Sequence, residues 1–177
     1  MRITSTAILA LCLSTMAAPA LSQDEGGAMA SATAALKGAD GADHGSVMLK
    51  QTPNGVLLTL DLKDVPAGVH GFHIHETGKC APDFKAAGGH FAEGKDHGFL
   101  AEGGPHPGDM PNIHVDDSGA LKQEVLNTRI SLNEGEDGYL MDEDGSAILI
   151  HSGADDYQSQ PSGDAGDRIA CGVIETN

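Results

Sequence analysis

The sequence predicts an all-β domain, an antiparallel sandwich or barrel of eight short strands with two long functional loops. Three observations lead to this prediction. No stretch shows helical periodicity over three turns, short apolar segments alternate with Gly-rich turns, and two long polar segments interrupt the pattern. At 177 residues, the chain is long enough for one domain with a proper core and too short for two comfortable ones.

Eight segments have the composition and length of strands. They are residues 30–36, 45–51, 56–62, 68–76, 111–115, 121–126, 147–151 and 169–174. Pro53-Asn54-Gly55 follows the second segment and Asp116-Asp117-Ser118-Gly119 follows the fifth, and both are typical of hairpin turns. Residues 76–110 and 152–168 are too long and polar for hairpins. Because most of the potentially reactive side chains lie in or beside these two segments, we expect functional loops there rather than disorder.

The N-terminus is typical of a secretory signal peptide. A basic Arg2 precedes an apolar run over residues 7–13, and the small residues 18–20 suit cleavage after Ala20 or Ser22. The apolar run is too short to span a bilayer. The expected organisation is a signal peptide at 1–22, a flexible linker at 23–29 and a folded domain at 30–177.

Export changes the expected chemistry of the cysteines. Cleavage would remove Cys12 and leave Cys80 and Cys171. Because an exported chain with two cysteines should join them, we expect a disulfide between these two residues.

Charge restricts the partners of the chain. The formal net charge is −16, and loss of the positive Arg2 makes it −17. Such a charge excludes non-specific binding to nucleic acid or to an anionic membrane. An anionic substrate would be repelled by the whole molecule, so its binding would need local positive charge.

Histidines and one aspartate suggest two metal sites. His73 and His75 share one face of a strand because strand side chains alternate, whereas Phe72 and Ile74 face the other way. A first set joins this pair to two further imidazoles: His73, His75, His90 and His151. Imidazoles suit copper, zinc, iron or nickel, and among these copper or iron would readily exchange single electrons. A second set is typical of structural zinc: His90, His97, His106 and Asp109.

These residues resemble the copper/zinc superoxide dismutase family, in its bacterial, periplasmic form. The resemblance runs from about residue 32 to residue 174. It depends on GFHIHE at 71–76, GGHF at 88–91, HPGD at 106–109, ILIH at 148–151 and GDRIACGVI at 166–174. It implies an eight-stranded Greek-key β-barrel of the immunoglobulin-like sandwich type. It also implies a periplasmic enzyme that dismutes superoxide to dioxygen and hydrogen peroxide, with one copper and one zinc per subunit.

The resemblance assigns a role to each of the site residues. The first histidine set would bind copper, the second set would bind zinc, and His90 would bridge the two ions. In the family mechanism His90 releases copper on reduction, takes up a proton and returns it to the peroxide. Asp155 would tie a copper histidine to a zinc histidine, and Arg168 would lie beside the open copper position, where its donor fork suits a small oxyanion. His70 resembles a structural histidine of the family that binds no metal, and His44 and His114 are expected to be ordinary surface or hydrogen-bonded residues.

The chain departs from the family in places, and other functions fit part of the pattern. Ala92-Glu93 and a short spacing from His90 to His97 put the path of the zinc loop in doubt. Pro161 stands where eukaryotic members have an anion-guiding lysine, which leaves Lys79 and Lys85 either as substitutes or as solvated charges. A metal store would explain the histidines but not Arg168, and an adhesion-type module would explain neither. Bacterial relatives include monomers and dimers, so a homodimer stays open.

Overall fold

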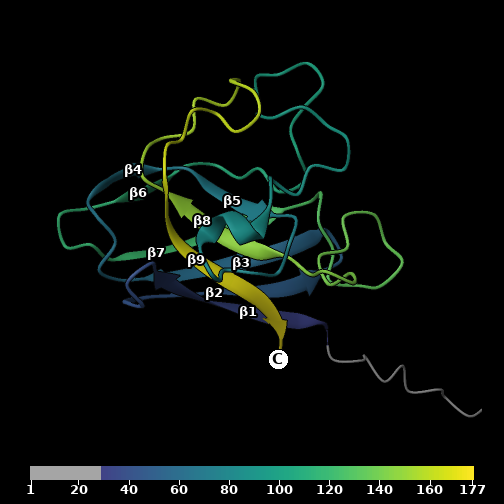
Figure 1. Ribbon diagram of the computed structural model, residues 1–177. Coiled ribbons are helices and arrows are strands. Elements are labelled where there is room, and N and C mark those ends of the chain that lie inside the picture. The colour runs from purple at the N-terminus through teal and green to yellow at the C-terminus, as the bar shows by residue number, and fades with distance from the viewer. Residues whose placement is uncertain (1–28) are drawn as a thin grey trace, which may run out of the picture.

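Nine strands and one short 3₁₀ helix form the part of the chain that the computed structural model describes, residues 29–177 (Figure 1). The strands are β1 (Ser31–Gly38), β2 (Asp43–Thr52), β3 (Gly55–Leu62), β4 (Gly68–His70), β5 (Phe72–His75), β6 (Ile113–Val115), β7 (Leu121–Asn127), β8 (Ala147–His151) and β9 (Arg168–Thr176). The helix is η1 (Phe84–Ala87). The expected signal peptide, and the expected linker except for its last residue, lie outside the described residues.

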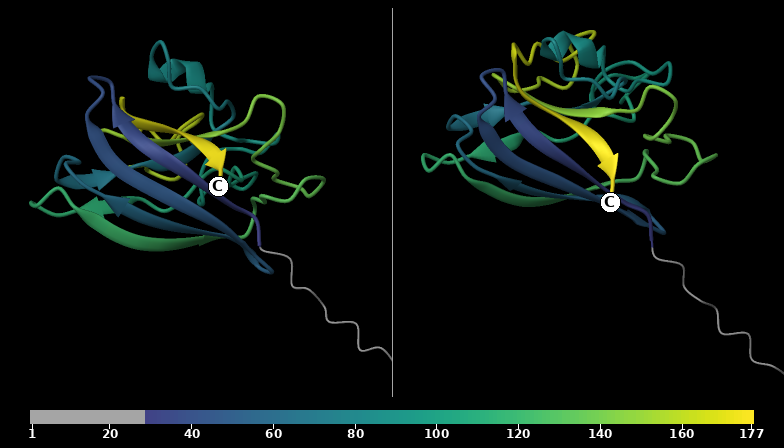
Figure 2. Two further views of the ribbon diagram at one scale, coloured as in Figure 1. Left: turned by 90° about the horizontal axis from the view of Figure 1, so that it is seen from below. Right: turned by 60° about the horizontal axis from the view of Figure 1, so that its bottom comes forward.

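All the strand pairs are antiparallel within residues 29–177, and they form one long sheet and one short sheet. The order of the seven-stranded sheet is β5-β8-β9-β1-β2-β3-β7, and β4 pairs with β6 in the second. Figure 2 shows the long sheet curling, with β1, β2, β3 and β7 as one curved wall. The neighbours β3–β7, β5–β8 and β9–β1 are not consecutive in sequence, as expected of a Greek-key barrel. The predicted all-β fold is confirmed.

Alternating side chains build the core. In β3, Val56, Leu58, Leu60 and Leu62 point inward and are almost fully buried, whereas the residues between them are exposed or half-buried. This is the period-two pattern of a strand with one wet face. β5 and β8 differ, because every residue of both strands is buried. Phe72 and Ile74 face the main core, so the histidines of β5 lie on the opposite face of the strand, buried beneath the long loops.

The expected strand at residues 68–76 is divided at Gly71, and its halves pair with different strands. β4 pairs with β6, and β5 pairs with β8. The N–H of Gly71 donates to the carbonyl of Gly153 at 2.7 Å, and its carbonyl accepts from the N–H of His151 at 2.9 Å. A Cβ at Gly71 would lie 2.9 Å from the Cβ of Ala165. Close approach of the second loop therefore requires glycine at this corner.

The two expected loops lie next to each other in the upper part of the view in Figure 1. The N–H of His97 donates to Oε1 of Gln160 at 2.9 Å, and Nε2 of Gln160 donates back to the carbonyl of His97 at 2.9 Å. A third long connection, residues 128–146, was not among the expected loops. It buries Ile130, Leu132 and Leu140 in the main core, so part of this connection closes the barrel.

A disulfide ties the first loop to the last strand. Cys80 and Cys171 are joined as expected, with Cα atoms 5.8 Å apart. Cys171 lies in β9, and Ala87 of η1, Ala147, Leu149 and Cys171 form a small buried cluster of their own. The start of the first long loop is therefore anchored both covalently and by packing. Among residues 29–177, no helix has the length and apolar composition to cross a membrane.

Loss of the disulfide should destabilise the domain. The linked cysteines are 91 residues apart, and for such a loop the chain-entropy model gives about 4–5 kcal/mol of stabilisation. We expect the double variant Cys80→Ser/Cys171→Ser to unfold at lower temperature and lower urea concentration than the parent. Equal stability, or two titratable thiols in the unreduced parent after denaturation, would contradict this account.

Candidate metal centre

Three parts of the chain deliver the expected ligands to the face of the β5–β8 pair that lies opposite the main core. β5 carries His73 and His75, and the last residue of β8 is His151. The loop between β5 and β6 carries His90, His97, His106 and Asp109. All seven side chains are buried: His73, His75, His90, His97, His106, Asp109 and His151. The structure brings them together in the two sets that the sequence analysis expected.

In the first cluster, four histidine nitrogens face a common space. The cluster comprises His73, His75, His90 and His151, whose candidate ligand atoms all lie within 4.8 Å of one another. Nδ1 of His73 and Nε2 of the other three are buried without a hydrogen-bond partner among the described residues. A buried polar atom left in this way costs about 1–3 kcal/mol. Four such nitrogens facing one another fit a metal ion, which would satisfy all of them.

The second nitrogen of each strand histidine has a protein partner. Nε2 of His73 lies 2.8 Å from Oδ2 of Asp155, Nδ1 of His75 lies 3.1 Å from the carbonyl of Gly88, and Nδ1 of His151 lies 3.3 Å from the carbonyl of Gly166. Each ring donates through this nitrogen, which leaves the opposite nitrogen as the acceptor that a metal requires.

Burial keeps these imidazoles neutral. Desolvation lowers the pKa of His73 to about 3 and that of His151 to about 4. It also lowers the pKa of His75 well below its ordinary value, and the nearby charges of His90 and Arg168 act in the same direction. Metal ligation requires the neutral ring, so the site is set for a cation at ordinary pH.

In the second cluster, three histidines converge on one carboxylate oxygen. Nδ1 of His90, His97 and His106 lies 2.9, 3.1 and 3.2 Å, respectively, from Oδ1 of Asp109. Burial would raise the pKa of Asp109, but hydrogen bonds from the histidines and from the Gly98 N–H hold it well below its usual range. The set of three imidazoles and one ionised carboxylate fits zinc.

Asp109 is itself oriented by the backbone. Its Oδ2 accepts hydrogen bonds from the N–H of Gly98 at 2.8 Å and from the N–H of His106 at 3.0 Å. A Cβ at Gly98, where φ is 97°, would meet the carbonyl oxygen of Tyr157 at 2.0 Å, so only glycine fits this turn. With Oδ2 held in this way, Oδ1 is directed at the three rings.

His90 belongs to both clusters. Its Nδ1 faces Asp109, whereas its Nε2 is one of the four partnerless nitrogens of the first cluster. Its ring centroid lies 4.1 Å from that of His73 and 5.5 Å from that of His106. Because the two nitrogens of an imidazole point to opposite sides of the ring, one side chain can serve two ions.

Asp155 makes a second link between the clusters. Its Oδ2 lies 2.8 Å from Nε2 of His73, and its Oδ1 lies 2.9 Å from Nε2 of His97. Burial would raise the pKa of Asp155, but these hydrogen bonds lower it. Burial would lower the pKa of His97, yet the hydrogen bonds to Asp109 and Asp155 outweigh it and raise that pKa to about 9.

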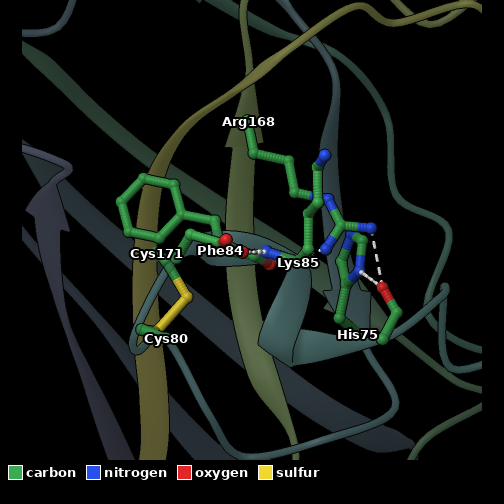
Figure 3. The surroundings of a disulfide bond; sticks show 8 residues. His75, Cys80, Phe84, Lys85, Arg168 and Cys171 are labelled. Atoms are coloured by element: carbon green, nitrogen blue, oxygen red, sulfur yellow. Dashed lines mark hydrogen bonds between the residues drawn. A yellow bond between two sulfur atoms is a disulfide. The ribbon is translucent and has the colours of Figure 1, made fainter.

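Arg168 is fixed beside the first cluster by the disulfide-bonded loop (Figure 3). Its Nη1 donates to the carbonyl of Phe84 and its Nη2 to the carbonyl of Gly88, each at 2.6 Å. The carbonyl of Gly88 also accepts the hydrogen bond from His75, so this one carbonyl joins the arginine to the first cluster. The side chain is half-buried, and its charge contributes to lowering the pKa values of His75 and His151.

The other singled-out residues lie outside the clusters. His70 is buried, with its ring nitrogens 2.8 Å from the carbonyls of His151 and Pro66, which suits a structural part. His114 is exposed and His44 is half-buried. Asp156 is exposed and caps its own turn through Ser159.

Sequence reasoning missed two residues that support the backbone of the second cluster. Nδ2 of Asn127 donates to the carbonyl of Pro107 at 2.8 Å, and Nη2 of Arg129 donates to the carbonyl of Asp109 at 2.9 Å. Both residues lie at or just beyond the end of β7. Backbone carbonyls bear no mark of residue type, so no sequence pattern identifies such a partner.

Comparisons with known proteins agree with this geometry. A sequence model described as copper/zinc superoxide dismutase matches residues 43–174. The chain is 51% identical over 134 residues to superoxide dismutase [Cu-Zn] 1 of Aquifex aeolicus, covering 74% of this chain and 79% of the relative. It is 45% identical to superoxide dismutase [Cu-Zn] of Caulobacter vibrioides, covering 82% and 86%. A crystal structure of a SOD-like protein from Bacillus subtilis is similar with a TM-score of 0.77 at 37% identity, covering 80% and 96%.

The division into two clusters predicts different metal losses in two variants. His151→Ala should lose copper and keep most of its zinc, because His151 belongs only to the first cluster. Asp109→Ala should lose zinc and stability first, while copper stays bound. Metal content by mass spectrometry measures both, and equal loss of the two metals in His151→Ala would contradict the division.

Proposed function

The chain belongs to the copper/zinc superoxide dismutase family and converts superoxide to dioxygen and hydrogen peroxide, and we propose which of its side chains carry that reaction. The proposed copper ligands are His73, His75, His90 and His151, and the proposed zinc ligands are His90, His97, His106 and Asp109. The observation that carries the proposal is the position of His90, with one nitrogen in each cluster. Copper bound there supplies one-electron exchange, and zinc supplies a fixed positive charge without redox chemistry.

Arg168 binds the anion in this proposal. A guanidinium has five N–H donors, and the carbonyls of Phe84 and Gly88 occupy two of them. Three donors therefore remain for a small oxyanion, on a side chain whose position is already fixed. Holding the guanidinium in place before the substrate arrives reduces the entropy lost on binding.

His90 supplies a proton at Nε2. Its Nδ1 faces Asp109, where zinc would bind, so Nε2 is the nitrogen that can gain and lose a proton within the first cluster. Burial lowers the pKa of His90, although the hydrogen bond to Asp109 opposes this effect. A proton held at Nε2 would lie on the side of the ring that faces the first cluster, which suits delivery to a peroxide product.

A metal store without turnover is the alternative from another class. It would need the two clusters but not a half-buried arginine fixed beside one of them. Superoxide dismutase activity of the purified protein, measured before copper removal, after removal and after reconstitution, tests the proposal. Activity that follows copper content supports the enzyme. Full metal binding without activity would favour the store.

Residues 1–22 direct export to the periplasm in this proposal, residues 23–29 act as a linker and residues 30–177 form the dismutase domain. A basic Arg2, the apolar run and the small residues before the cleavage position support the export signal. The disulfide of the folded domain also supports an oxidising compartment.

Lys85 is better placed than Lys79 to guide the anion. A hollow of about 770 Å³ beside the disulfide is lined by Lys37, Lys85 and Arg168, together with neutral residues, Asp83 and Asp167. Figure 3 shows Lys85 alongside Arg168. Lys79 is exposed and does not line this hollow.

Replacing Arg168 should slow the reaction without releasing metal. Arg168→Ala removes both the charge and the donor fork, so the bimolecular rate should fall substantially at unchanged copper and zinc content. Arg168→Lys should retain an intermediate rate because the charge survives. Pulse radiolysis or stopped-flow kinetics measures the rate, and a rate equal to the parent's in Arg168→Ala would remove Arg168 from the proposal.

Salt should slow the parent enzyme. Screening at 0.1 M acts over about 10 Å, so a rate that falls with salt indicates local attraction, and a rate that rises indicates repulsion by the net charge of −17. We expect the fall. Lys85→Gln should weaken it, and Lys79→Gln is the matched control. A rate that rises with salt and is unchanged by either variant would show that neither lysine guides the anion.

A further inference from the structure

The backbone of Asp155 is fixed by Asn112, a residue that belongs to neither metal cluster. The side-chain amide of Asn112 donates from Nδ2 to the carbonyl of Asp155 at 2.8 Å and accepts the N–H of Asp155 at Oδ1, at 2.9 Å. These two bonds pair a planar amide with the backbone of one residue, as two strands pair in a sheet. They therefore set both the position and the direction of that backbone.

Tyr157 fixes the carboxylate of the same residue. Its N–H donates to Oδ1 of Asp155 at 2.6 Å, and its hydroxyl accepts the N–H of Asn112 at 2.8 Å. Asn112 and Tyr157 thus hold Asp155 and also hold each other. The ring of Tyr157 packs against Phe99, with centroids 5.4 Å apart, which anchors the tyrosine to the zinc loop.

The backbone of Tyr157 is strained in a way that this arrangement explains. Its φ is 65°, a left-handed conformation that residues with large side chains rarely adopt. Strain of this kind persists where the surrounding contacts require it, and it concentrates at functional sites. Here the contacts that require it are the hydrogen bond to Asp155, the bond to Asn112 and the packing on Phe99.

We propose that Asn112 and Tyr157 are positioning residues, which hold the Asp155 carboxylate between His73 and His97 and so set the geometry of both metal sites. The inference rests on the proposed metal assignment. Within the described residues, neither side chain hydrogen-bonds to a cluster histidine, so both act through Asp155.

Loss of the clamp formed by Asn112 and Tyr157 should disturb both histidines that Asp155 contacts, His97 and His73. His97 would lose the acceptor that orients its ring for zinc, and His73 would lose the one that orients its ring for copper. Mutation of a residue that hydrogen-bonds to a metal ligand typically lowers the metal affinity by about 10–100-fold. The clamp residues contact Asp155 and not the histidines themselves, so we expect an effect at the low end of this range. Zinc affinity should fall about tenfold, and the copper spectrum should shift because His73 is reoriented.

Two variants and one matched control test the proposal on protein loaded with copper and zinc. Asn112→Asp keeps the size of the side chain but sets an acceptor against the carbonyl of Asp155. Tyr157→Phe keeps the ring on Phe99 and removes the hydroxyl. The control, Asn133→Asp, makes the same chemical change where Nδ2 bonds to Glu136, outside both clusters. Zinc dissociation constants by chelator competition, and copper absorption and paramagnetic resonance spectra, are measured below the melting temperature of every variant.

We expect Asn112→Asp to bind zinc about tenfold more weakly with a shifted copper spectrum, Tyr157→Phe to change less in the same direction, and Asn133→Asp to match the parent. The proposal is overturned if both clamp variants keep the parent's zinc dissociation constant within about twofold and its copper spectrum, even if they melt earlier. If Asn112→Asp does not fold, Tyr157→Phe decides by the same criteria. A parent that binds no zinc would instead overturn the metal assignment, and this inference with it.

Discussion

The two-sided imidazole of His90 is the constraint on which the rest of the site depends. For one ring to serve two clusters, its Nε2 must face the histidines of β5 and β8 while its Nδ1 faces Asp109. The loop between β5 and β6, which carries His90, must therefore pack against the β5–β8 pair, whose residues are all buried. The disulfide at the start of this loop and the backbone-held Asp109 at its end keep the ring in place.

The clusters on either side of His90 are built on different electrostatics. In the first, burial lowers the pKa values of His73 and His151 and leaves neutral rings with nitrogens that lack partners. In the second, the ionised carboxylate of Asp109 accepts hydrogen bonds from three histidine rings, which lower its pKa. A metal bound in the first cluster, beside Arg168, could thus change its charge by one without a change in the charge of its neutral histidines. The second cluster would hold its metal in a fixed position. Against a formal net charge of −16, the fixed arginine is the local attraction that an anionic substrate needs.

The members of the two clusters could be predicted from sequence because metal binding requires particular residue types. His73 and His75 share a face by strand alternation, and the order of the remaining cluster residues matches a known family. The supports could not be predicted in the same way. Asn127 and Arg129 bond to backbone carbonyls, and Gly71 breaks a strand because Ala165 approaches it from a loop 94 residues later in the numbering, a tertiary contact without a local signal. The packing of Ile130, Leu132 and Leu140 from the connection at 128–146 was missed because these apolar residues follow no regular period.

The central claim is that one histidine holds two metals, and anomalous X-ray diffraction at the copper and zinc absorption edges tests it most directly. Crystals of the loaded protein should show one copper peak beside Nε2 of His90, among the four nitrogens of the first cluster. They should show one zinc peak beside Nδ1 of the same ring, with Asp109. A single metal site, or either peak away from the ring of His90, would contradict the account.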